Sequence, residues 1–503
     1  MSSQDQHLGH MILAHRRKKE LTQQGLAEQI GISRASIASW ETGRSKPSDE
    51  QLGLLADKLE METNLLKPPT FEISEEIERV KNVCLNELGS VTSDLSNKLL
   101  EATFDLALPI KDLDKRANES FKGFIKKHIA PEFDNGIILF SEEELDRNGN
   151  LKPIVIRKNG VIEEDKMDFT CEHYIVLDPL DRSTEAVRSI AGFSHFSVCS
   201  FKDGFLFSII CLLFDPYIMF YYAVRGQGAF IRTKNSQTKP LYPGTVRSLP
   251  GACIGAYVGK PSRLELISYC KKLFERQKEE SVFVNVSGSY GFALAASGQI
   301  DGFFEITKGY RWHDIIAGAH VLQEAGGVVK GLDFEELDDP FSSEFFNITG
   351  RRLEEFKNKY NSNIPPKVLE GLNNLAFPDD QNKRKEKNYK SYGEILQFLA
   401  KLGTNNMDER IQVEKLMILI CNFFYDLPEI KNQLNKRQRF VSASTYELGA
   451  QICIELAKNE FPFKEWDKKY DSDFSDLGSE GGTPQSADEK KTGSDASEGS
   501  AAE

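Results

Sequence analysis

Two carboxylates and two hydroxyls gather in "DPLDRST", residues 178–184. The apolar run "HYIVL" directly before them is typical of a buried strand that delivers Asp178 at its C-terminal end, where α/β folds often bind ligands. Carboxylates as close as Asp178 and Asp181 repel each other unless a cation lies between them, and Mg²⁺ takes oxygen ligands of this kind. A structural Asp-Pro turn is the alternative, and this motif alone does not decide between the two.

Two further segments present acids beside apolar runs. "GIILFSEEEL", residues 136–145, ends an apolar run with three glutamates. "RWHDIIAGAHVLQEAGGVV", residues 311–329, predicts a helix that Asp314 opens and Gly326-Gly327 ends. Because three separate elements each present an acid at one end, the sequence favours a shared metal site over three unrelated turns.

Several matched segments in a fixed order extend this interpretation. They are "FSEEE", "DPLDRST", "SGSYGFALAASGQIDGFFE" and "WHDIIAGAHVLQEAGG", with weaker support from "DLDKRANESFKGFI" and "YYAVRGQGAFI". Over about residues 75–350 the chain resembles the inositol monophosphatase and fructose-bisphosphatase superfamily of Mg²⁺-dependent, lithium-sensitive phosphatases. The resemblance implies an α-β-α-β-α layered α/β domain, which we place at residues 72–355, with two or three Mg²⁺ ions.

The resemblance also implies roles for individual residues. The implied metal ligands are Glu142, Asp178, the Leu180 carbonyl, Asp181 and Asp314. Glu142 is taken from the acidic triplet by matching "SEE" to the family's acidic pair, which leaves Glu143 as its neighbour. The implied catalytic residues are Glu142 and a water-activating pair of Ser183 and Asp114, with Asp112 as the other aspartate nearby. The implied substrate contacts are Ser183, Gly288, Ser289 and Glu305, together with the backbone N–H groups of 182 and 183, and the side chain of Arg182 is a further candidate.

Three departures from the family pattern bear on the substrate. Arg182 replaces a glycine, "EA" at 185–186 replaces the usual "NF", and His313 is an extra residue between Trp312 and Asp314. If position 182 needs a positive φ, an arginine there costs energy. If it does not, the guanidinium adds a charge that attracts phosphate. None of these changes removes a metal carboxylate, so we expect an active site.

A second motif lies near the N-terminus, in "LTQQGLAEQIGISRASIASWETGRSKPS", residues 21–48. Thr22 and Ser33 can each cap a helix, and Gly31 permits a sharp turn between the two helices. The segment resembles the phage-repressor (Cro-like) helix-turn-helix family over about residues 8–66, and we place this all-α head at 7–67. The residues expected at DNA are Gln23, Gln24, Ser33, Arg34, Ser36 and Ser39, with Arg44 and Lys46 at phosphates.

The charge of this head bears on how it would bind. Residues 1–50 hold seven Lys/Arg against six Asp/Glu, so a single copy should bind double-stranded DNA weakly. A homodimer that reads two half-sites would remedy this. A helical module that binds only protein is the alternative interpretation.

The rest of the chain is less informative. Residues 385–469 show apolar residues at helical spacing, which predicts an α-helical domain of unknown role. Residues 471–503 are rich in Ser, Gly and acids, which predicts a disordered acidic tail. The net charge of −13 excludes a protein that coats nucleic acid by charge alone. The N-terminus shows no signal peptide, and the apolar run 205–224 is broken by Asp215-Pro216, so we expect a cytoplasmic protein outside the membrane.

These observations predict a multidomain enzyme: a hydrolase of a small phosphomonoester (an inositol, sugar or nucleotide phosphate) coupled to sequence-specific DNA binding. One alternative is a transcription regulator whose phosphatase-like domain senses a phosphorylated metabolite without turnover. A second is a stress or phage-defence effector whose head represses its own operon.

Overall fold

The computed structural model describes the chain in ranges. They are 8–9, 12–13, 16, 19, 21–41, 45–59, 73–105, 110–146, 151–164, 167–168, 170–186, 192–201, 203–246, 248–258, 282–332, 348–349, 357–358, 389–390 and 437–457. The chain divides into a unit Met1–Phe461 and a unit Pro462–Glu503, and all described residues belong to the first. Among them, no helix combines the length and apolar character that crossing a bilayer requires.

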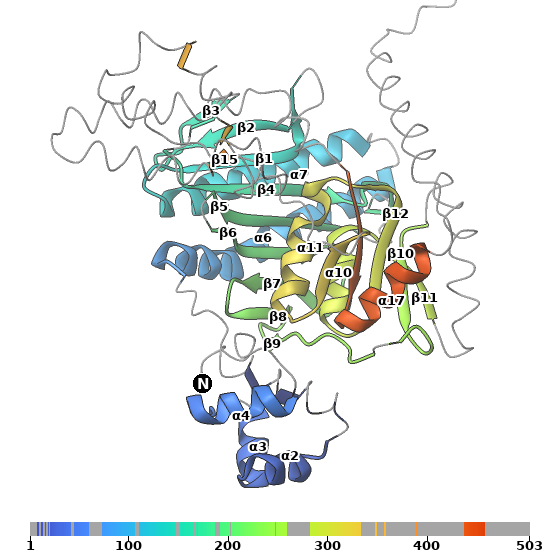
Figure 1. The fold of residues 1–503 in the computed structure, drawn as a ribbon. Helices are drawn as coiled ribbons and strands as arrows, with labels where there is room; N and C mark the ends of the chain where they lie inside the picture. Colours follow the sequence, from blue (N-terminus) through green and yellow to red (C-terminus); the bar gives the residue numbers. More distant parts are fainter. Residues whose placement is uncertain are drawn as a thin grey trace, which may run out of the picture. The chain divides into compact units, whose positions relative to one another are not determined.

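The described part of the N-terminal head includes the helices α2 Gln23–Ile30, α3 Arg34–Glu41 and α4 Asp49–Leu59 (Figure 1). The Thr22 hydroxyl accepts a hydrogen bond from the Gly25 N–H at 2.9 Å and so caps α2. Gly31 ends α2 with φ 71°. The Ser33 hydroxyl accepts from the Ser36 N–H at 3.0 Å at the start of α3. The two caps and the glycine turn agree with the prediction.

A nine-stranded sheet forms the first layer of strands in the central domain. Its order is β3-β2-β1-β4-β5-β6-β7-β8-β9, with β1 and β4 parallel and the other neighbours antiparallel. The strands are β1 Ile137–Leu145, β2 Leu151–Ile156, β3 Ile162–Glu164, β4 His173–Asp181, β5 Phe193–Ser200, β6 Gly204–Leu212, β7 Ile218–Val224, β8 Gly228–Thr233 and β9 Thr238–Pro240. The apolar run 205–224 is therefore two buried strands, as the Asp-Pro break predicts.

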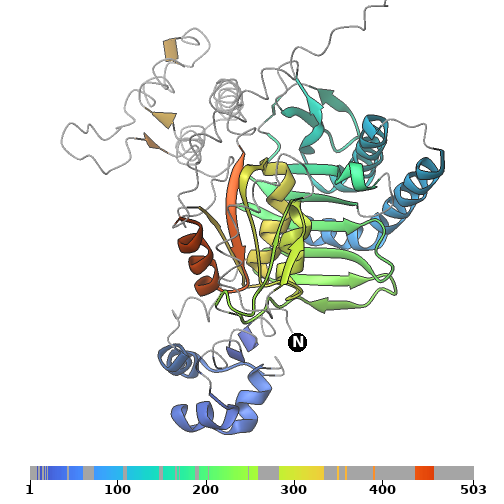
Figure 2. The same cartoon turned by 90° about the vertical axis from the view of Figure 1, so that its right-hand side faces the viewer.

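Helices cover both faces of this sheet. α6 Glu75–Asp105 and α7 Ile110–Phe124 pack on one face, and α7 continues into a short π-helix, Ile125–Ile129, and a 3-10 turn, Ala130–Glu132. α10 Gly288–Ala296 and α11 Trp312–Glu324 lie between this sheet and a second one (Figure 1; Figure 2). Alternation along β4 divides the two cores, since Tyr174 and Val176 face α10 and α11 while Ile175 and Leu177 face α6 and α7.

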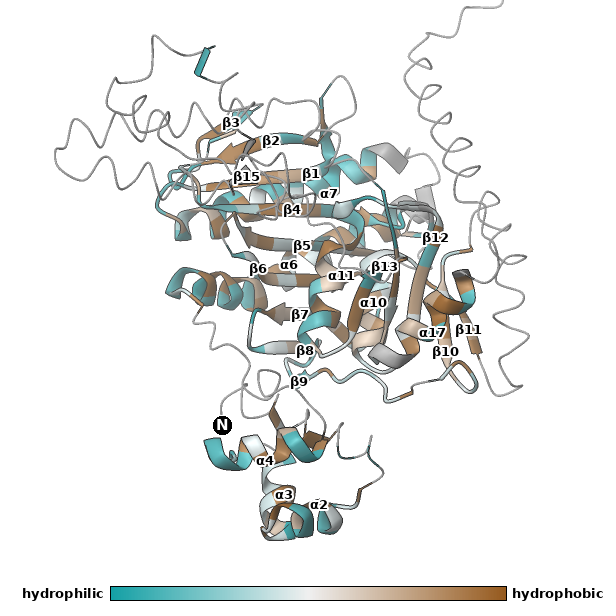
Figure 3. Cartoon of the chain, in the orientation of Figure 1, coloured by the Kyte–Doolittle hydropathy of each residue, from teal (hydrophilic) through white to brown (hydrophobic). Residues whose placement is uncertain are grey.

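The second sheet has five strands in the order β11-β10-β12-β16-β13. They are β10 Cys253–Ala256, β11 Val282–Asn285, β12 Gly302–Tyr310, β13 Val328–Gly331 and β16 Gln438–Ala443. α17 Tyr446–Ala457 packs against β16 and β13 and completes the α-β-α-β-α layering that the sequence predicts. Hydrophobic residues concentrate on the strands of both sheets (Figure 3). Two short elements remain, helix α8 Ser183–Ala186 and the pair β14 Ile348–Thr349 with β15 Tyr389–Lys390.

Strand β16 corrects the prediction of a separate all-helical domain at 385–469. Residues 440–443 pair with both β12 and β13, and Ser442 donates to the Phe303 carbonyl at 2.8 Å. Phe440, Val441 and Ala443 are buried on both faces of the sheet, which removes the apolar-polar alternation that would mark a strand. The helix predicted within 443–461 agrees with α17. The other predicted helices of this region, and the acidic tail 471–503, lie outside the described residues.

Candidate active site

Strand β4 delivers both aspartates of "DPLDRST". Tyr174 and Val176 face α10 and α11, so alternation places Asp178 on the same face. Asp181 would point to the opposite face of a regular strand. The pairing of β4 with β5 is irregular between Asp178 and Asp181, and one oxygen of each carboxylate lies within 4.8 Å of the other and of a ring nitrogen of His195. The irregular strand end thus turns both carboxylates towards one point.

Gly288, at the start of α10, makes room for Asp181. Its φ is 55°, and a Cβ at this position would lie 2.0 Å from Asp181 Oδ2. Both the backbone conformation and the close approach therefore require glycine. Asp181 Oδ2 is buried and makes no hydrogen bond within the described residues.

Strand β1 brings Glu142 to the same space. Ile138 and Phe140 belong to the core on the α10 and α11 side, and alternation puts Glu142 on that side too. Ser141 points the other way and donates to Asn118 Oδ1 of α7 at 2.7 Å. This alternation distinguishes Glu142 from Glu143, which the sequence could separate only by motif matching.

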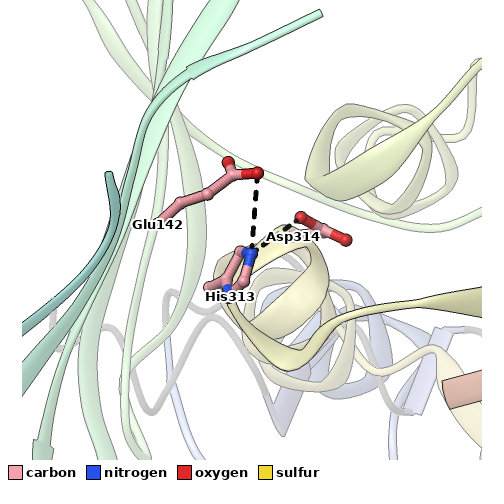
Figure 4. Close-up of side chains that lie close together, drawn as sticks. All are labelled: Glu142, His313 and Asp314. Carbon is pink, nitrogen blue, oxygen red and sulfur yellow. Dashed lines mark ion pairs between the residues drawn. The ribbon is translucent and has the colours of Figure 1, made fainter. Parts of the chain in front are cut away.

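Helix α11 adds two side chains from its first turn. The Arg311 N–H donates to Asp314 Oδ2 at 2.7 Å, so one oxygen of Asp314 caps the helix. The other oxygen, Oδ1, lies 3.3 Å from His313 Nε2, and the same nitrogen lies 3.8 Å from Glu142 Oε1. Figure 4 shows the imidazole pointing between the two carboxylates. Three elements distant in sequence therefore meet in one buried cluster.

The environment disfavours the charged form of the three aspartates of this cluster, whereas at Glu142 the effect of burial is outweighed by nearby His313, which lowers the pKa of that carboxyl. Burial raises the pKa of Asp178 well above its usual range, and Glu142 and Asp181 raise it further by repulsion. Burial and repulsion from Asp314 and Glu142 do the same to the pKa of Asp181, while a hydrogen bond from the Arg182 N–H lowers it in part. Burial also raises the pKa of Asp314. Such a group of acids is costly without a cation.

Asp114 of α7 lies beside this cluster. Burial, followed by repulsion from Glu143 and Glu142, raises its pKa to about 7, and a hydrogen bond with Ser183 lowers it in part. Asp112 of the same helix is exposed to solvent. The structure thus places Asp114, and not Asp112, next to Ser183.

The third glutamate of "SEEE" lies apart from the cluster. Glu144 Oε1 accepts from Lys122 Nζ at 2.8 Å and from Asn118 Nδ2 at 2.9 Å. Both donors belong to α7, so this side chain ties β1 to the helix that covers it.

Arg182 adopts the left-handed conformation that the family's glycine would suit, with φ 61°. Its guanidinium Nη2 lies 3.2 Å from Glu185 Oε1, and its carbon Cζ lies 5.9 Å from the centre of the Tyr257 ring. The Tyr257 hydroxyl donates to the same Glu185 oxygen at 3.3 Å. Arg182 and Glu185, which both depart from the family pattern, therefore form one ion pair. Tyr257, the residue after β10, adds a hydrogen bond to Glu185.

Ser289 and Glu305 both make hydrogen bonds within the protein. The Ser289 hydroxyl donates to the Asp314 carbonyl at 3.0 Å and accepts from the Gly318 N–H at 3.1 Å. It is fully buried and joins α10 to α11. Glu305 is also fully buried, and one of its oxygens accepts from the Thr307 N–H at 2.7 Å. Their predicted substrate contacts stay predictions.

The polar residues of the head divide into buried and exposed groups. The Gln23 amide donates to Glu41 Oε2 at 2.8 Å, and Arg16 Nη2 donates to the same atom at 3.1 Å. Glu41 is buried, so Gln23 takes part in an internal network. Gln24 is exposed and donates to Glu28 at 2.8 Å.

The remaining residues expected at DNA lie on or after α3. Arg34 and Lys46 are exposed, and Ser36 shares a 2.8 Å hydrogen bond with Ser33. Ser39 shares one of the same length with Ser45. Arg44 lies outside the described residues.

Two histidines of the cluster were not assigned a role from the sequence. The register of β5 against β4 places His195 opposite Asp178, with its Nε2 3.5 Å from Asp178 Oδ2. His313 stands beside Asp314 in the chain, and this adjacency in the first turn of a helix is a signal that could have identified it. His320 does have ordinary core partners, since Ser208 Oγ lies 2.8 Å from its Nδ1.

The donor set fits a hard divalent cation. Asp181 Oδ2 and Asp114 Oδ1 are buried without a hydrogen bond in the described part of the chain, although such oxygens nearly always have a partner. Mg²⁺ prefers carboxylate oxygens and would relieve the repulsion between them. The residues of this cluster therefore fit the ion that the sequence predicts.

A layered α/β domain with a carboxylate cluster and an adjacent Ser-Asp pair is the arrangement of a metal-dependent phosphatase. The model of the inositol monophosphatase family matches residues 86–359, just over half of the chain. The chain belongs to this family, and both the resemblance and the enzyme class predicted from the sequence are confirmed. A helix-turn-helix family model matches residues 12–66 and confirms the predicted head.

Individual relatives match parts of the chain. The fructose-1,6-bisphosphatase/inositol-1-monophosphatase of Methanothermobacter thermautotrophicus is 27% identical over 215 residues, which cover 40% of this chain and 72% of that protein. The Nus factor SuhB of Escherichia coli is 29% identical over 182 residues, 35% of this chain and 61% of that protein, which is less than two thirds of its length. The solved structure of Mycobacterium tuberculosis SuhB is 18% identical with a TM-score of 0.38, and the match covers 51% of this chain and 88% of that one.

Proposed function

We propose that this chain is a cytoplasmic Mg²⁺-dependent hydrolase of a small phosphomonoester, and that its head binds double-stranded DNA. The observation that carries the enzymatic part is the buried oxygen of Asp181 without a partner, among the repelling carboxylates of Asp178, Glu142 and Asp314. This arrangement is unfavourable in a purely structural site. It suits a site that holds cations.

The chain's own residues have distinct parts in the proposed reaction. The carboxylates of Glu142, Asp178, Asp181 and Asp314, with the Leu180 carbonyl, would hold Mg²⁺. The bound ions supply charge neutralisation for the phosphoryl group. Asp114, whose pKa is raised to about 7, can take a proton at its carboxylate near neutral pH, and the Ser183 hydroxyl hydrogen-bonded to it would orient the attacking water.

The residues proposed to contact the substrate differ most from the family pattern. The Arg182 guanidinium lies at the same strand end as Asp181, and its Nε is buried without a hydrogen bond in the part of the chain described. A guanidinium with a free donor suits an anionic group of the substrate. We therefore assign Arg182 to substrate recognition, for an inositol, sugar or nucleotide phosphate.

A phosphate-release panel tests the enzymatic part. Purified full-length protein is incubated with inositol, sugar and nucleotide monophosphates and bisphosphates, with Mg²⁺ and with or without Li⁺. We expect Mg²⁺-dependent release from at least one member, and suppression of that release by Li⁺. If no member of a broad panel is hydrolysed with Mg²⁺, the hydrolase proposal is wrong.

The DNA-binding part rests on the helix-turn-helix match and on the exposed side chain of Arg34 at the start of α3. The proposed homodimer would read two half-sites and compensate for the weak charge of each head. Selection of the full-length protein against random duplexes should enrich a two-fold symmetric site. Arg34→Ala should then weaken binding to that site, while Gln29→Ala, on the exposed part of α2, should have a smaller effect.

A regulator that senses a phosphorylated metabolite without turnover is the second candidate. It is favoured by Arg182, because a guanidinium kept in a costly backbone conformation suits tight ligand binding. Such a protein would change its affinity for DNA when the metabolite is added, and the metabolite would be recovered intact. Consumption of the metabolite during the binding assay contradicts this candidate.

A further inference from the structure

His313 is buried in the cluster without a conventional partner. Its exposed fraction is 0%, and neither ring nitrogen makes a hydrogen bond within the described residues. A buried imidazole without a hydrogen bond costs stability, so such groups usually have a further ligand. The imidazole of His313 is therefore a candidate to bind a further ligand.

The first turn of α11 fixes where the imidazole points. Asp314 uses Oδ2 to accept from the Arg311 N–H, and this capping bond leaves Oδ1 facing His313. Glu142 approaches the same nitrogen from β1 (Figure 4). Nε2 and the two carboxylate oxygens therefore converge from two elements that are independently anchored.

The separations suit ligands of one metal ion. His313 Nε2 lies 3.3 Å from Asp314 Oδ1 and 3.8 Å from Glu142 Oε1, and the three atoms lie within 4.8 Å of one another. Nitrogen and oxygen ligands lie about 2.0–2.2 Å from a first-row divalent ion, which puts neighbouring ligands roughly 3–3.5 Å apart. The three ligand atoms would need to move only slightly closer together to match this spacing.

We propose that His313 is a metal ligand, and that Glu142, His313 and Asp314 form a mixed nitrogen-oxygen site that favours a first-row transition ion over Mg²⁺. This inference deepens the proposed function and rests on its metal dependence, but not on turnover. Mg²⁺ favours oxygen ligands and water, whereas imidazole is a better ligand for first-row transition ions. The residues around Asp178 and Asp181 would keep the ordinary oxygen-rich site.

Pulsed electron paramagnetic resonance of bound Mn²⁺ tests the assignment directly. Metal-free full-length protein is loaded with Mn²⁺, and the ¹⁴N modulation of a coordinated imidazole is recorded. We expect this modulation in the wild type and its loss in His313→Phe. A Mn²⁺ titration should show at least about a tenfold loss of affinity in the variant. Competition with Mg²⁺ should show a smaller loss for Mg²⁺.

Two further variants make the result specific. His320→Asn removes a buried histidine from the same helix but outside the cluster, and it should keep the ¹⁴N modulation. His313→Gln keeps a polar side chain, and it should lose the modulation while its circular dichroism matches the wild type, in case His313→Phe does not fold.

Several results would overturn the proposal. Bound Mn²⁺ without nitrogen modulation means that His313 only pairs with the carboxylates. Modulation that survives in His313→Phe but disappears in His195→Asn assigns the ligand to His195 instead. Equal losses for Mn²⁺ and Mg²⁺ contradict the selectivity. A protein that binds no Mn²⁺ contradicts the metal dependence of the proposed function as well, whereas oxygen-only coordination contradicts this inference alone.

Discussion

Helix α11 carries a partly buried carboxylate at each end, and the two have different kinds of partner. Glu324, in the last turn, accepts from the Gly226 N–H at 3.0 Å, in the turn between β7 and β8, and from the Gly228 N–H at 3.2 Å, at the start of β8. Asp314, in the first turn, has one oxygen in a helix cap and the other in a cluster with Glu142. The carboxylate of Glu324 therefore has hydrogen-bond donors within the protein, whereas Oδ1 of Asp314 is available to a ligand.

The comparison separates structural from functional acids on one element. Burial raises the pKa of both side chains, so burial alone does not distinguish them. The partners do, because no carboxylate of the described residues repels Glu324 and two backbone N–H groups lower its pKa in part, while Asp314 has Glu142 beside it, which raises its pKa against the partial lowering by His313 and the Arg311 N–H. The following predictions test this difference, beginning with the largest effect.

Asp181→Asn should abolish Mg²⁺-dependent phosphate release and also stabilise the metal-free protein. The amide keeps the shape of the side chain but removes a buried charge that Asp314 and Glu142 repel. The melting temperature of the metal-free variant should therefore exceed that of the wild type, and added Mg²⁺ should stabilise only the wild type. A variant that is less stable than the metal-free wild type would show that Asp181 is a structural residue.

Asp114→Asn should lower kcat by about 10²–10⁴-fold with Mg²⁺ binding retained, as expected for loss of a general base. The pKa of Asp114 is raised to about 7, and the residue acts after it has lost its proton. The wild-type kcat/KM should therefore rise with pH up to about 7 and then level off. The variant should lack this rise. Asp112→Asn is the matched control on the same helix, and an equal loss there would contradict the assignment.

Glu324→Ala should lower the free energy of unfolding by about 1–3 kcal/mol, because it leaves the N–H groups of Gly226 and Gly228 without their partner. Denaturant titration measures this change. Mg²⁺ binding should persist, since the residue lies at the other end of the helix from Asp314. Loss of Mg²⁺ binding without loss of stability would reverse the roles assigned to the two carboxylates.

Arg182→Gly and Arg182→Asn should change the free energy of unfolding by less than about 1 kcal/mol. Each relieves the cost of a left-handed arginine, of about 1 kcal/mol, and loses an ion pair with Glu185 of similar worth. Both should lower kcat/KM for substrates with a second anionic group by about tenfold relative to those without. A uniform loss across all substrates would mean that the guanidinium only supports the turn.

The sequence predicts most of the layers and the carboxylates of the cluster, because these depend on local motifs. It cannot predict the place of β16, since residues 440–443 pair with β13, which ends at Gly331 more than a hundred residues earlier, and nothing in the segment indicates that partner. The hydrogen bond between Gln23 and Glu41 could not be predicted either, because the two residues are distant in sequence. The φ of Arg182 stays open from sequence because it depends on the turn that follows β4.

The most direct test of the central claim is a calorimetric titration of Mg²⁺ into metal-free wild type, Asp181→Asn and Glu324→Gln. The two variants each remove one buried carboxylate charge, one from the cluster and one from the satisfied end of α11. We predict saturable binding in the wild type and in Glu324→Gln, and loss of that binding in Asp181→Asn. Unchanged Mg²⁺ binding in Asp181→Asn would contradict the account.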